Sequence, residues 1–416
     1  MTTTRRAAAV GFGLSLALVA SACGSSTKSS AGATTAAAKP AAGATTAAAK
    51  PAAGATTAAA KPAAGATTAA APVTTAAAGA GASAGAGCLP IAESAKQTLK
   101  AVKKIALVFD SVGRGDGSFN DGAGCGYDLA KKDFGLTGDN AVEQTPKADG
   151  SDRADKLSLV CKAGANPVIA VGFLFTDPMD QVATTCTTTS FGIIDSVAKS
   201  SNVAGLVFAQ NEGSFLVGVA AGLKTKSNKV GFVGGMEGDL IREFQAGFQA
   251  GVKAANPTAV VTAKYAGTEV TAFSDPATGK TIGKAMVDEG IDVIYTAAGS
   301  TGNGTFDAVK EANDAGKKVW AIGVDSDQGS AGNKGVKDEV KPFIITSMLK
   351  RVDVAVYDTI KKVNEGTFKG GVVQYNLANG GIDYATTGGK IDDIKAKIDD
   401  FKKQIIAGTI KVPSKP

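Results

Sequence analysis

Val108-Phe109-Asp110-Ser111-Val112-Gly113-Arg114-Gly115-Asp116-Gly117-Ser118-Phe119-Asn120-Asp121 is the stretch that decides the fold. It continues an apolar run from Ile105, passes through a series of glycines, and leads into an Ala/Gly/Leu helical pattern at about Asn120. A buried parallel strand, a turn and a helix N-terminus have this order. Because ligands bind at the carboxyl ends of strands in open α/β sheets, Asp110, Phe119 and Asn120 are candidate ligand residues.

The glycine-rich turn permits a second interpretation, in which its backbone cradles a phosphate. The glycines depart from the order G-x-G-x-x-G, however, and Asp110 and Asp116 would repel a phosphate. A neutral, flat, polar ligand fits better, since Phe119 can stack on a planar base and Asn120 can hydrogen-bond to its edge. Structural roles stay open for both residues, Phe119 as a core aromatic and Asn120 as a helix N-cap.

The composition excludes several classes of function. The 416 residues carry a net charge of +6 with no long basic run, which gives little support to nucleic-acid binding. The chain has no histidine, so the usual general base, the usual zinc ligand and Ser-His or Cys-His nucleophiles are absent. We therefore expect no catalytic residues, no metal site and no cofactor.

The N-terminal region predicts an exported chain. Arg5-Arg6, an apolar run and small residues before Cys23 are typical of a secretory signal, which we place at residues 1–22. Ala20-Ser21-Ala22-Cys23 resembles the bacterial lipobox, in which the cysteine becomes the lipidated first residue. The alternatives are an ordinary signal cleaved near Ala22 or an uncleaved membrane anchor.

Residues 23–87 are rich in Ala, Thr, Gly, Pro and Lys, and they repeat an Ala/Thr-rich unit from Gly32, Gly43 and Gly54. Such a segment has no large apolar side chains to bury. It cannot offset the entropy of ordering, so we predict a disordered tether.

The remaining cysteines are Cys88, Cys125, Cys161 and Cys186. In an exported chain disulfides are expected, and four cysteines allow three pairings. We favour Cys161 with Cys186, on helical stretches that flank one strand, and Cys88 with Cys125, which ties the N-terminal segment to the first helix. Their spacing matches no CxxC zinc site.

Beyond Cys88 strands and helices alternate, with two successive βαβ series. We expect strands at 105–110, 141–144, 167–172, 191–195, 203–209, 229–234, 259–265, 293–297, 318–325 and 343–347. This pattern predicts an α/β protein with two doubly wound parallel-sheet lobes and a ligand cleft between them. We assign 88–210 and about 350–370 to lobe 1, and 211–349 and about 371–416 to lobe 2.

Three candidates follow strands of the second lobe. Gly299 lies in a glycine-rich turn that exposes backbone amides, Asp325 can grip vicinal hydroxyls, and Lys350 ends a strand. The corresponding structural roles are a mere glycine turn for the first and a solvated surface side chain for Lys350.

Several motifs in sequence order resemble the basic membrane protein (BMP) family of ABC-transporter substrate-binding lipoproteins, which includes purine nucleoside receptors. These motifs are Ser118-Phe119-Asn120-Asp121, Gly172-Phe173-Leu174-Phe175-Thr176-Asp177, Glu212-Gly213-Ser214-Phe215-Leu216-Val217-Gly218, Lys229-Val230-Gly231-Phe232-Val233-Gly234-Gly235-Met236, Phe244-Gln245-Ala246-Gly247-Phe248, Gly323-Val324-Asp325-Ser326-Asp327-Gln328 and the stretch 347–353. The resemblance runs from about Lys103 to about Gly370 and does not cover the tether.

The resemblance implies a type I periplasmic binding-protein fold with two lobes joined by a hinge. It also implies that Phe119 and Phe244 sandwich a purine base. Asn120 and Asp177 would read the edge of the base, with Asp177 aligned only through Gly172-Phe173. The ribose would be held by Gly299, Asp325 and Lys350, with Asp110 beside them. Cys125, Cys186 and Ser300 depart from the family pattern without removing a ligand group.

We therefore expect a monomeric, lipid-anchored, extracytoplasmic receptor that presents a nucleoside to an ABC permease. A second possibility is a sensor or surface ligand-binding lipoprotein without transport. A nucleoside hydrolase that uses Asp110 and Asp325 is a third, although the scattered aspartates form no metal-binding cluster.

Overall fold

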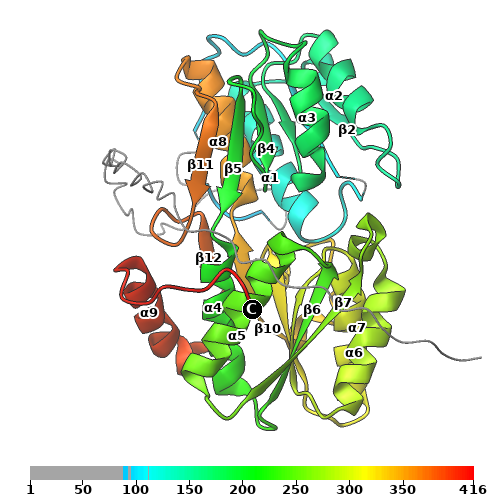
Figure 1. Cartoon of the computed structure of the whole chain (residues 1–416), viewed down its shortest axis with the longest axis vertical. Coiled ribbons are helices and arrows are strands. Elements are labelled where there is room, and N and C mark those ends of the chain that lie inside the picture. Colours follow the sequence, from blue (N-terminus) through cyan, green and yellow to red (C-terminus); the bar gives the residue numbers. More distant parts are fainter. Residues whose placement is uncertain (1–87, 92–94, 111) are drawn as a thin grey trace, which may run out of the picture. The chain divides into compact units, whose positions relative to one another are not determined.

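The computed structural model describes residues 88–91, 95–110 and 112–416. The expected signal segment (1–22), the lipid attachment at Cys23 and the tether (23–87) lie outside these residues. The described chain forms two six-stranded sheets, each in a lobe of its own with helices on both faces (Figure 1). The expected two-lobed α/β fold is thus confirmed.

The first sheet has the strand order β11-β5-β4-β3-β1-β2, and its neighbouring strands are parallel. Its strands are β1 (Ile105–Val108), β2 (Ala141–Gln144), β3 (Val168–Ala170), β4 (Phe191–Ile194), β5 (Val203–Phe208) and β11 (Gly371–Tyr375), and the lobe's helices are α1 (Phe119–Phe134), α2 (Arg153–Lys162), α3 (Thr176–Ala183) and α8 (Val352–Glu365). Alternate side chains of β1 explain the two helical layers. Ile105 and Leu107 pack with α1 and α8, whereas Ala106 and Val108 pack with α2 and α3.

The second sheet has the equivalent order β12-β10-β9-β8-β6-β7, with β12 antiparallel to β10. Its strands are β6 (Lys229–Met236), β7 (Val260–Gly267), β8 (Val293–Ala297), β9 (Trp320–Asp325), β10 (Ile344–Lys350) and β12 (Ile382–Tyr384), and the lobe's helices are α4 (Gln210–Lys224), α5 (Asp239–Ala255), α6 (Pro276–Asp288), α7 (Thr301–Asp314) and α9 (Asp392–Ile406). Short 3₁₀ helices occur at Gly138–Asn140, Phe173–Phe175, Val270–Phe273, Lys341–Phe343 and Thr387–Gly389.

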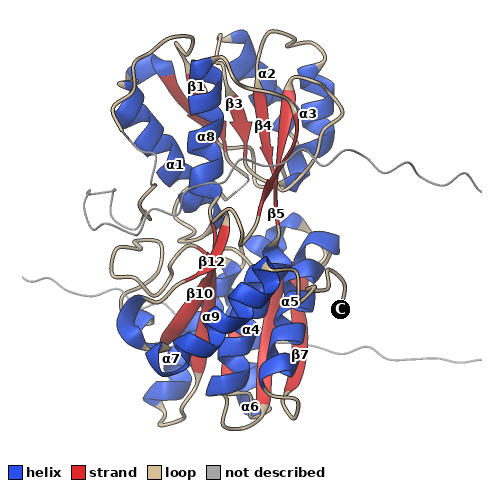
Figure 2. Ribbon diagram, turned by 90° about the vertical axis from the view of Figure 1, so that its left-hand side faces the viewer, coloured by secondary structure: helices blue, strands red, loops and turns tan. Residues whose placement is uncertain are grey.

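Within the described residues the chain passes between the lobes at three places, after β5, after β10 and after β11. Figure 2 shows β5 and β12 near this junction. Helix α4 follows a strand of the first sheet but packs on α5 of the second lobe, while α8 follows β10 and packs on α1 of the first. A Cβ at Gly126 of α1 or Gly247 of α5 would lie under 3.0 Å from backbone of the crossing helix, so these glycines permit the close approach.

The structure differs from the expected lobe boundaries at the third crossing. Strand β11 (Gly371–Tyr375) pairs with β5 in the first sheet, so the segment that returns to lobe 1 extends beyond 370. The expected elements did not include β11, β12 or α9. The two disulfides are those favoured from sequence, with Cα–Cα separations of 5.5 Å for Cys88–Cys125 and 6.5 Å for Cys161–Cys186.

Candidate ligand-binding cleft

A cavity lies between the lobes, where the carboxyl ends of the strands of both sheets meet. The first lobe lines it with Asp110, Val112, Asp116, Phe119, Asn120, Val171, Gly172, Phe173, Leu174 and Asp195. The second lobe and the β10 crossing add Leu240, Ile241, Phe244, Phe273, Ala297, Gly299, Val324, Asp325 and Lys350. Aromatic rings and carboxylates therefore face the same space from both sides.

The cavity brings together every ligand residue expected from the sequence except Asp177. That carboxylate is exposed in the first turn of α3 and does not line the cavity. Asp177 was aligned through the Gly172-Phe173 motif, and those two residues do line the cavity. Thr176–Ala183 forms a helix, which carries the aspartate away from the strand end.

Asn120 is buried, and its side-chain amide is held by two aspartates. Its Nδ2 donates to Asp110 Oδ1 at 2.9 Å and to Asp116 Oδ2 at 3.0 Å. Its Oδ1 accepts from the backbone N–H of Asp110 at 3.3 Å. Asn120 thus fixes the end of β1 relative to α1, and a ligand that accepts a hydrogen bond from Nδ2 must replace one of the two aspartates.

The interpretation of Asn120 as a helix N-cap is wrong, because Asp116 fulfils that function. The Asp116 carboxylate accepts from the backbone N–H groups of Ser118, Asn120 and Asp121 at 2.9–3.1 Å. Such a carboxylate satisfies donors at a helix start that have no intrahelical partner. The glycine run therefore brings a carboxylate to the N-terminus of α1, where a phosphate-binding turn would bring its ligand.

Burial shifts the titration of both acids in this part of the cleft. Desolvation raises the pKa of Asp116 to about 7, and the neighbouring charge of Asp121 raises it further. Desolvation also raises the pKa of Asp110, while the N–H groups of Val112 and Asn120 oppose that change. A cleft with these acids disfavours an anionic ligand.

Lys350 and Asp195 form a buried ion pair at the crossing between the lobes. Their side chains are 2% and 4% exposed, and Lys350 Nζ lies 2.6 Å from Asp195 Oδ2. The ammonium also lies 5.2 Å from the ring centroid of Phe119, 5.1 Å from that of Phe208 and 5.4 Å from that of Phe244. Asp195 Oδ1 is buried without a hydrogen-bond partner among the described residues, and desolvation raises the pKa of this carboxyl.

Asp325 lies at the end of β9 and contacts the opposite lobe. Ser118 Oγ donates to its Oδ2 at 2.7 Å. Desolvation raises the pKa of Asp325 to about 6, although the charge of Lys350 and the Ser118 hydroxyl oppose the change. Its backbone is left-handed, with φ of 63°. This conformation is uncommon outside glycine, and residues held in it cluster at functional sites.

Three residues line the cavity that were not predicted as ligand residues from sequence, namely Asp195, Asp116 and Phe273. Asp195 could have been predicted from the sequence, because it directly follows the apolar strand Phe191-Gly192-Ile193-Ile194. Asp110 and Asp325 follow apolar strands in the same way. Phe273 had none, because it follows no strand and enters the cleft from the 3₁₀ helix Val270–Phe273.

Two sheets of equivalent order with a lined cleft at their carboxyl ends define a two-lobed solute-binding protein. A solved solute-binding protein of an ABC transporter from Aeropyrum pernix K1 has this fold, with a TM-score of 0.65 and 30% identity. The match covers 74% of this chain and 94% of that one.

Residues 102–416 match the family model described as Bmp, ABC transporter substrate-binding protein PnrA-like, and the chain belongs to this family. The ABC transporter nucleoside-binding protein BmpA of Lactococcus lactis is 38% identical over 318 residues, which cover 75% of this chain and 89% of the relative. An uncharacterised lipoprotein of Pyrococcus abyssi is 34% identical, with 72% of each chain covered. The protein is thus a substrate-binding protein of the ABC-transporter type. In the part of the chain that the structure describes, no helix is long and apolar enough to cross a membrane.

Proposed function

We propose that the protein binds a purine nucleoside between its lobes and delivers it to an ABC permease. The observation that carries this proposal is the pair of phenylalanines that face the cleft from opposite lobes, Phe119 from α1 and Phe244 from α5. Rings on both sides suit a flat base. The name of the Lactococcus lactis relative supports a nucleoside as the ligand.

The polar groups of the cleft divide between the two halves of such a ligand. Asp325, Gly299 and Lys350 would hold the ribose, since a carboxylate accepts from vicinal hydroxyls and an ammonium donates to them. Asn120, together with Asp110, would meet the base edge. Each lobe holds part of the ligand, so binding favours the form in which the lobes are closed, and no bond is made or broken.

We further propose that Cys23 carries a lipid that anchors the protein as a monomer on the extracytoplasmic face of the membrane. The lipobox-like Ala20-Ser21-Ala22-Cys23 supports this, as does the name of the Pyrococcus abyssi relative. Replacing Cys23 by serine should move the protein from the membrane fraction to the soluble fraction of cells.

Calorimetric titration of purified protein with adenosine, guanosine and inosine tests the ligand. Saturable heat with at least one nucleoside is expected, and much weaker heat with ribose or hypoxanthine alone, because neither half fills the cleft. No saturable heat with any nucleoside, together with binding of another solute class, would overturn the proposal. Growth of a deletion strain on the bound nucleoside then separates uptake from sensing.

A further inference from the structure

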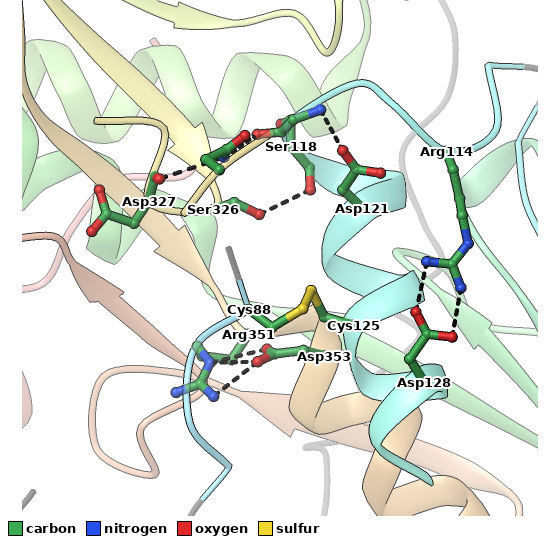
Figure 3. The surroundings of a disulfide bond; sticks show 12 residues. Cys88, Arg114, Ser118, Asp121, Cys125, Asp128, Ser326, Asp327, Arg351 and Asp353 are labelled. Carbon is green, nitrogen blue, oxygen red and sulfur yellow. Dashed lines mark hydrogen bonds and ion pairs between the residues drawn. A yellow bond between two sulfur atoms is a disulfide. The ribbon is translucent and has the colours of Figure 1, made fainter. Parts of the chain in front are cut away.

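The lobes also meet beside the cavity, at the turn before α1. Three successive backbone carbonyls of the first lobe each accept a hydrogen bond from a second-lobe side chain. Asp116 O accepts from Asn303 Nδ2 at 3.4 Å, Gly117 O from Asn333 Nδ2 at 2.9 Å and Ser118 O from Ser326 Oγ at 3.0 Å. Figure 3 shows Ser326 and Ser118 joined in this way. Asn303, Asn333 and Ser326 do not line the cavity.

The first-lobe side of this contact is fixed by bonds within its own lobe. Arg114 pairs with Asp128 of α1 at 3.0 Å (Figure 3). It also pairs with Glu143 of β2 at 2.8 Å, so the turn is held against both elements. The Asp121 carboxylate accepts from the backbone N–H groups of Gly115 and Gly117 at 2.7 Å and 2.8 Å. The three carbonyls are therefore presented in a set orientation.

The second-lobe side, residues 326–336, is fixed in the same manner. The side-chain Oε1 of Gln328 accepts from the backbone N–H of Val324 at 2.9 Å. The backbone N–H of Gln328 donates to Ser347 Oγ at 3.1 Å. Lys341 Nζ donates to the backbone carbonyl of Asn333 at 2.6 Å. Two surfaces that are each held within their own lobe dock with little loss of conformational entropy.

The docking depends on the absence of a side chain at Gly335. A Cβ added to Gly335 would lie under 3.0 Å from three atoms, namely N and Cα of Gly117 and an Asp121 carboxylate oxygen, all of the first lobe. Its φ lies outside the left-handed range, so an alanine there would not strain the backbone of its own segment. Gly329 of the same segment is a matched control, since the atoms nearest to its Cβ belong to Ile344 of its own lobe and lie at 3.4 Å or more.

We propose that the contact of residues 116–118 with residues 326–336 and Asn303 is a latch that sets ligand affinity by stabilising the closed form, through second-lobe side chains that do not line the cavity. When a ligand binds only the closed form, its apparent Kd equals the Kd of the closed form divided by the fraction of protein that is closed. A contact that raises the closed fraction therefore lowers the apparent Kd. The latch residues are positioning residues for binding. The inference rests on the proposed nucleoside only for the choice of probe.

The test compares wild type, Gly335→Ala, Gly329→Ala and Ser326→Ala by calorimetry with inosine and by small-angle X-ray scattering with and without it. Gly335→Ala should bind inosine roughly tenfold or more weakly, because a smaller closed fraction raises the apparent Kd. At inosine concentrations that decrease the radius of gyration of the wild type, Gly335→Ala should keep its ligand-free radius of gyration. Ser326→Ala should show a smaller loss, and Gly329→Ala none. Melting temperatures of the ligand-free proteins should be equal, which separates loss of the latch from misfolding.

Equal affinity and equal compaction of Gly335→Ala and wild type would overturn the latch. If inosine gives no heat with wild type, the comparison uses the solute that co-purifies with each variant, measured by mass spectrometry after denaturation. A non-nucleoside solute retained by wild type and Gly329→Ala but lost from Gly335→Ala would refute the proposed nucleoside and support the latch. Equal retention by all the variants would refute the latch.

Discussion

Asp195 and Asp325 occupy the same position in the two lobes but have different partners. Each stands at the carboxyl end of the fourth strand from the β2 or β7 edge, β4 in one sheet and β9 in the other. Each has left-handed backbone, with φ of 66° and 63°. Asp195 accepts from Lys350 at the crossing, whereas Asp325 accepts from Ser118 of the opposite lobe.

An aspartate with left-handed backbone at the end of a strand can therefore bind a cation in one lobe and a hydroxyl of the opposite lobe in the other. The Asp195 carboxylate has a cation beside it, the Lys350 ammonium at the end of β10. The Asp325 carboxylate accepts instead from a hydroxyl of the opposite lobe, that of Ser118. We therefore expect the first aspartate to matter chiefly for stability and the second to respond to closure and to pH.

The largest expected effect comes from breaking the pair at Asp195. Lys350→Met removes the ammonium and leaves a buried carboxylate unpaired, which should lower the free energy of unfolding by about 3–5 kcal/mol. Urea unfolding at neutral pH measures this. The double variant with Asp195→Asn should recover much of the lost stability, and a double variant as unstable as Lys350→Met would show that packing and not charge is responsible.

The second effect concerns the titration of Asp325. Its pKa is about 6 in the folded protein against an ordinary value of 3.8. The folded form therefore binds more protons than the unfolded form between these values. The stabilisation is fully present below pH 3.8 and is lost as the pH rises through about 6.

Asp325→Asn retains an acceptor for Ser118 and tolerates the left-handed backbone, but it cannot titrate. Relative to this variant, wild type should lose up to about 1.4 kcal/mol of stability per pH unit over that interval. Unfolding curves at several pH values check the slope. Parallel profiles for the two proteins would contradict the raised pKa.

The third effect tests the ring that lies beside the Asp195–Lys350 pair. Phe119→Ala should weaken nucleoside binding by about 1–3 kcal/mol, the range for a base stacked on an aromatic side chain. Phe368→Ala is the control, since that ring packs on the core and does not line the cavity. Calorimetry that finds equal losses for the two variants would argue against stacking at Phe119.

The smallest effect is expected for an aspartate outside the cleft. Asp177→Asn should change nucleoside affinity by no more than about 0.5 kcal/mol, because the side chain is exposed on α3. The resemblance to the family implies instead that this residue reads the base. A Kd that rises tenfold or more would contradict this expectation and show that Asp177 contacts the ligand.

The alternation of buried strands and helices predicted the two lobes because parallel strands leave continuous apolar runs. Strand β11 escaped prediction because most of its residues are exposed at a sheet edge, which removes the apolar signal. In the cleft, the aspartates that follow strands were predictable in principle. The bonding of Asn120 and the docking of Gly117 on Gly335 were not, since both depend on how segments distant in sequence meet.

The Cys88–Cys125 disulfide determines how a pulling force enters the fold. The bond closes a loop with a sequence separation of 37 residues, and this loop contains β1, a strand with neighbours on both sides. Tension on Cys88 passes through the sulfur atoms to α1 and does not peel β1 from the sheet. In a single-molecule stretching experiment, roughly 125 Å of extended chain should be missing until a reductant is added.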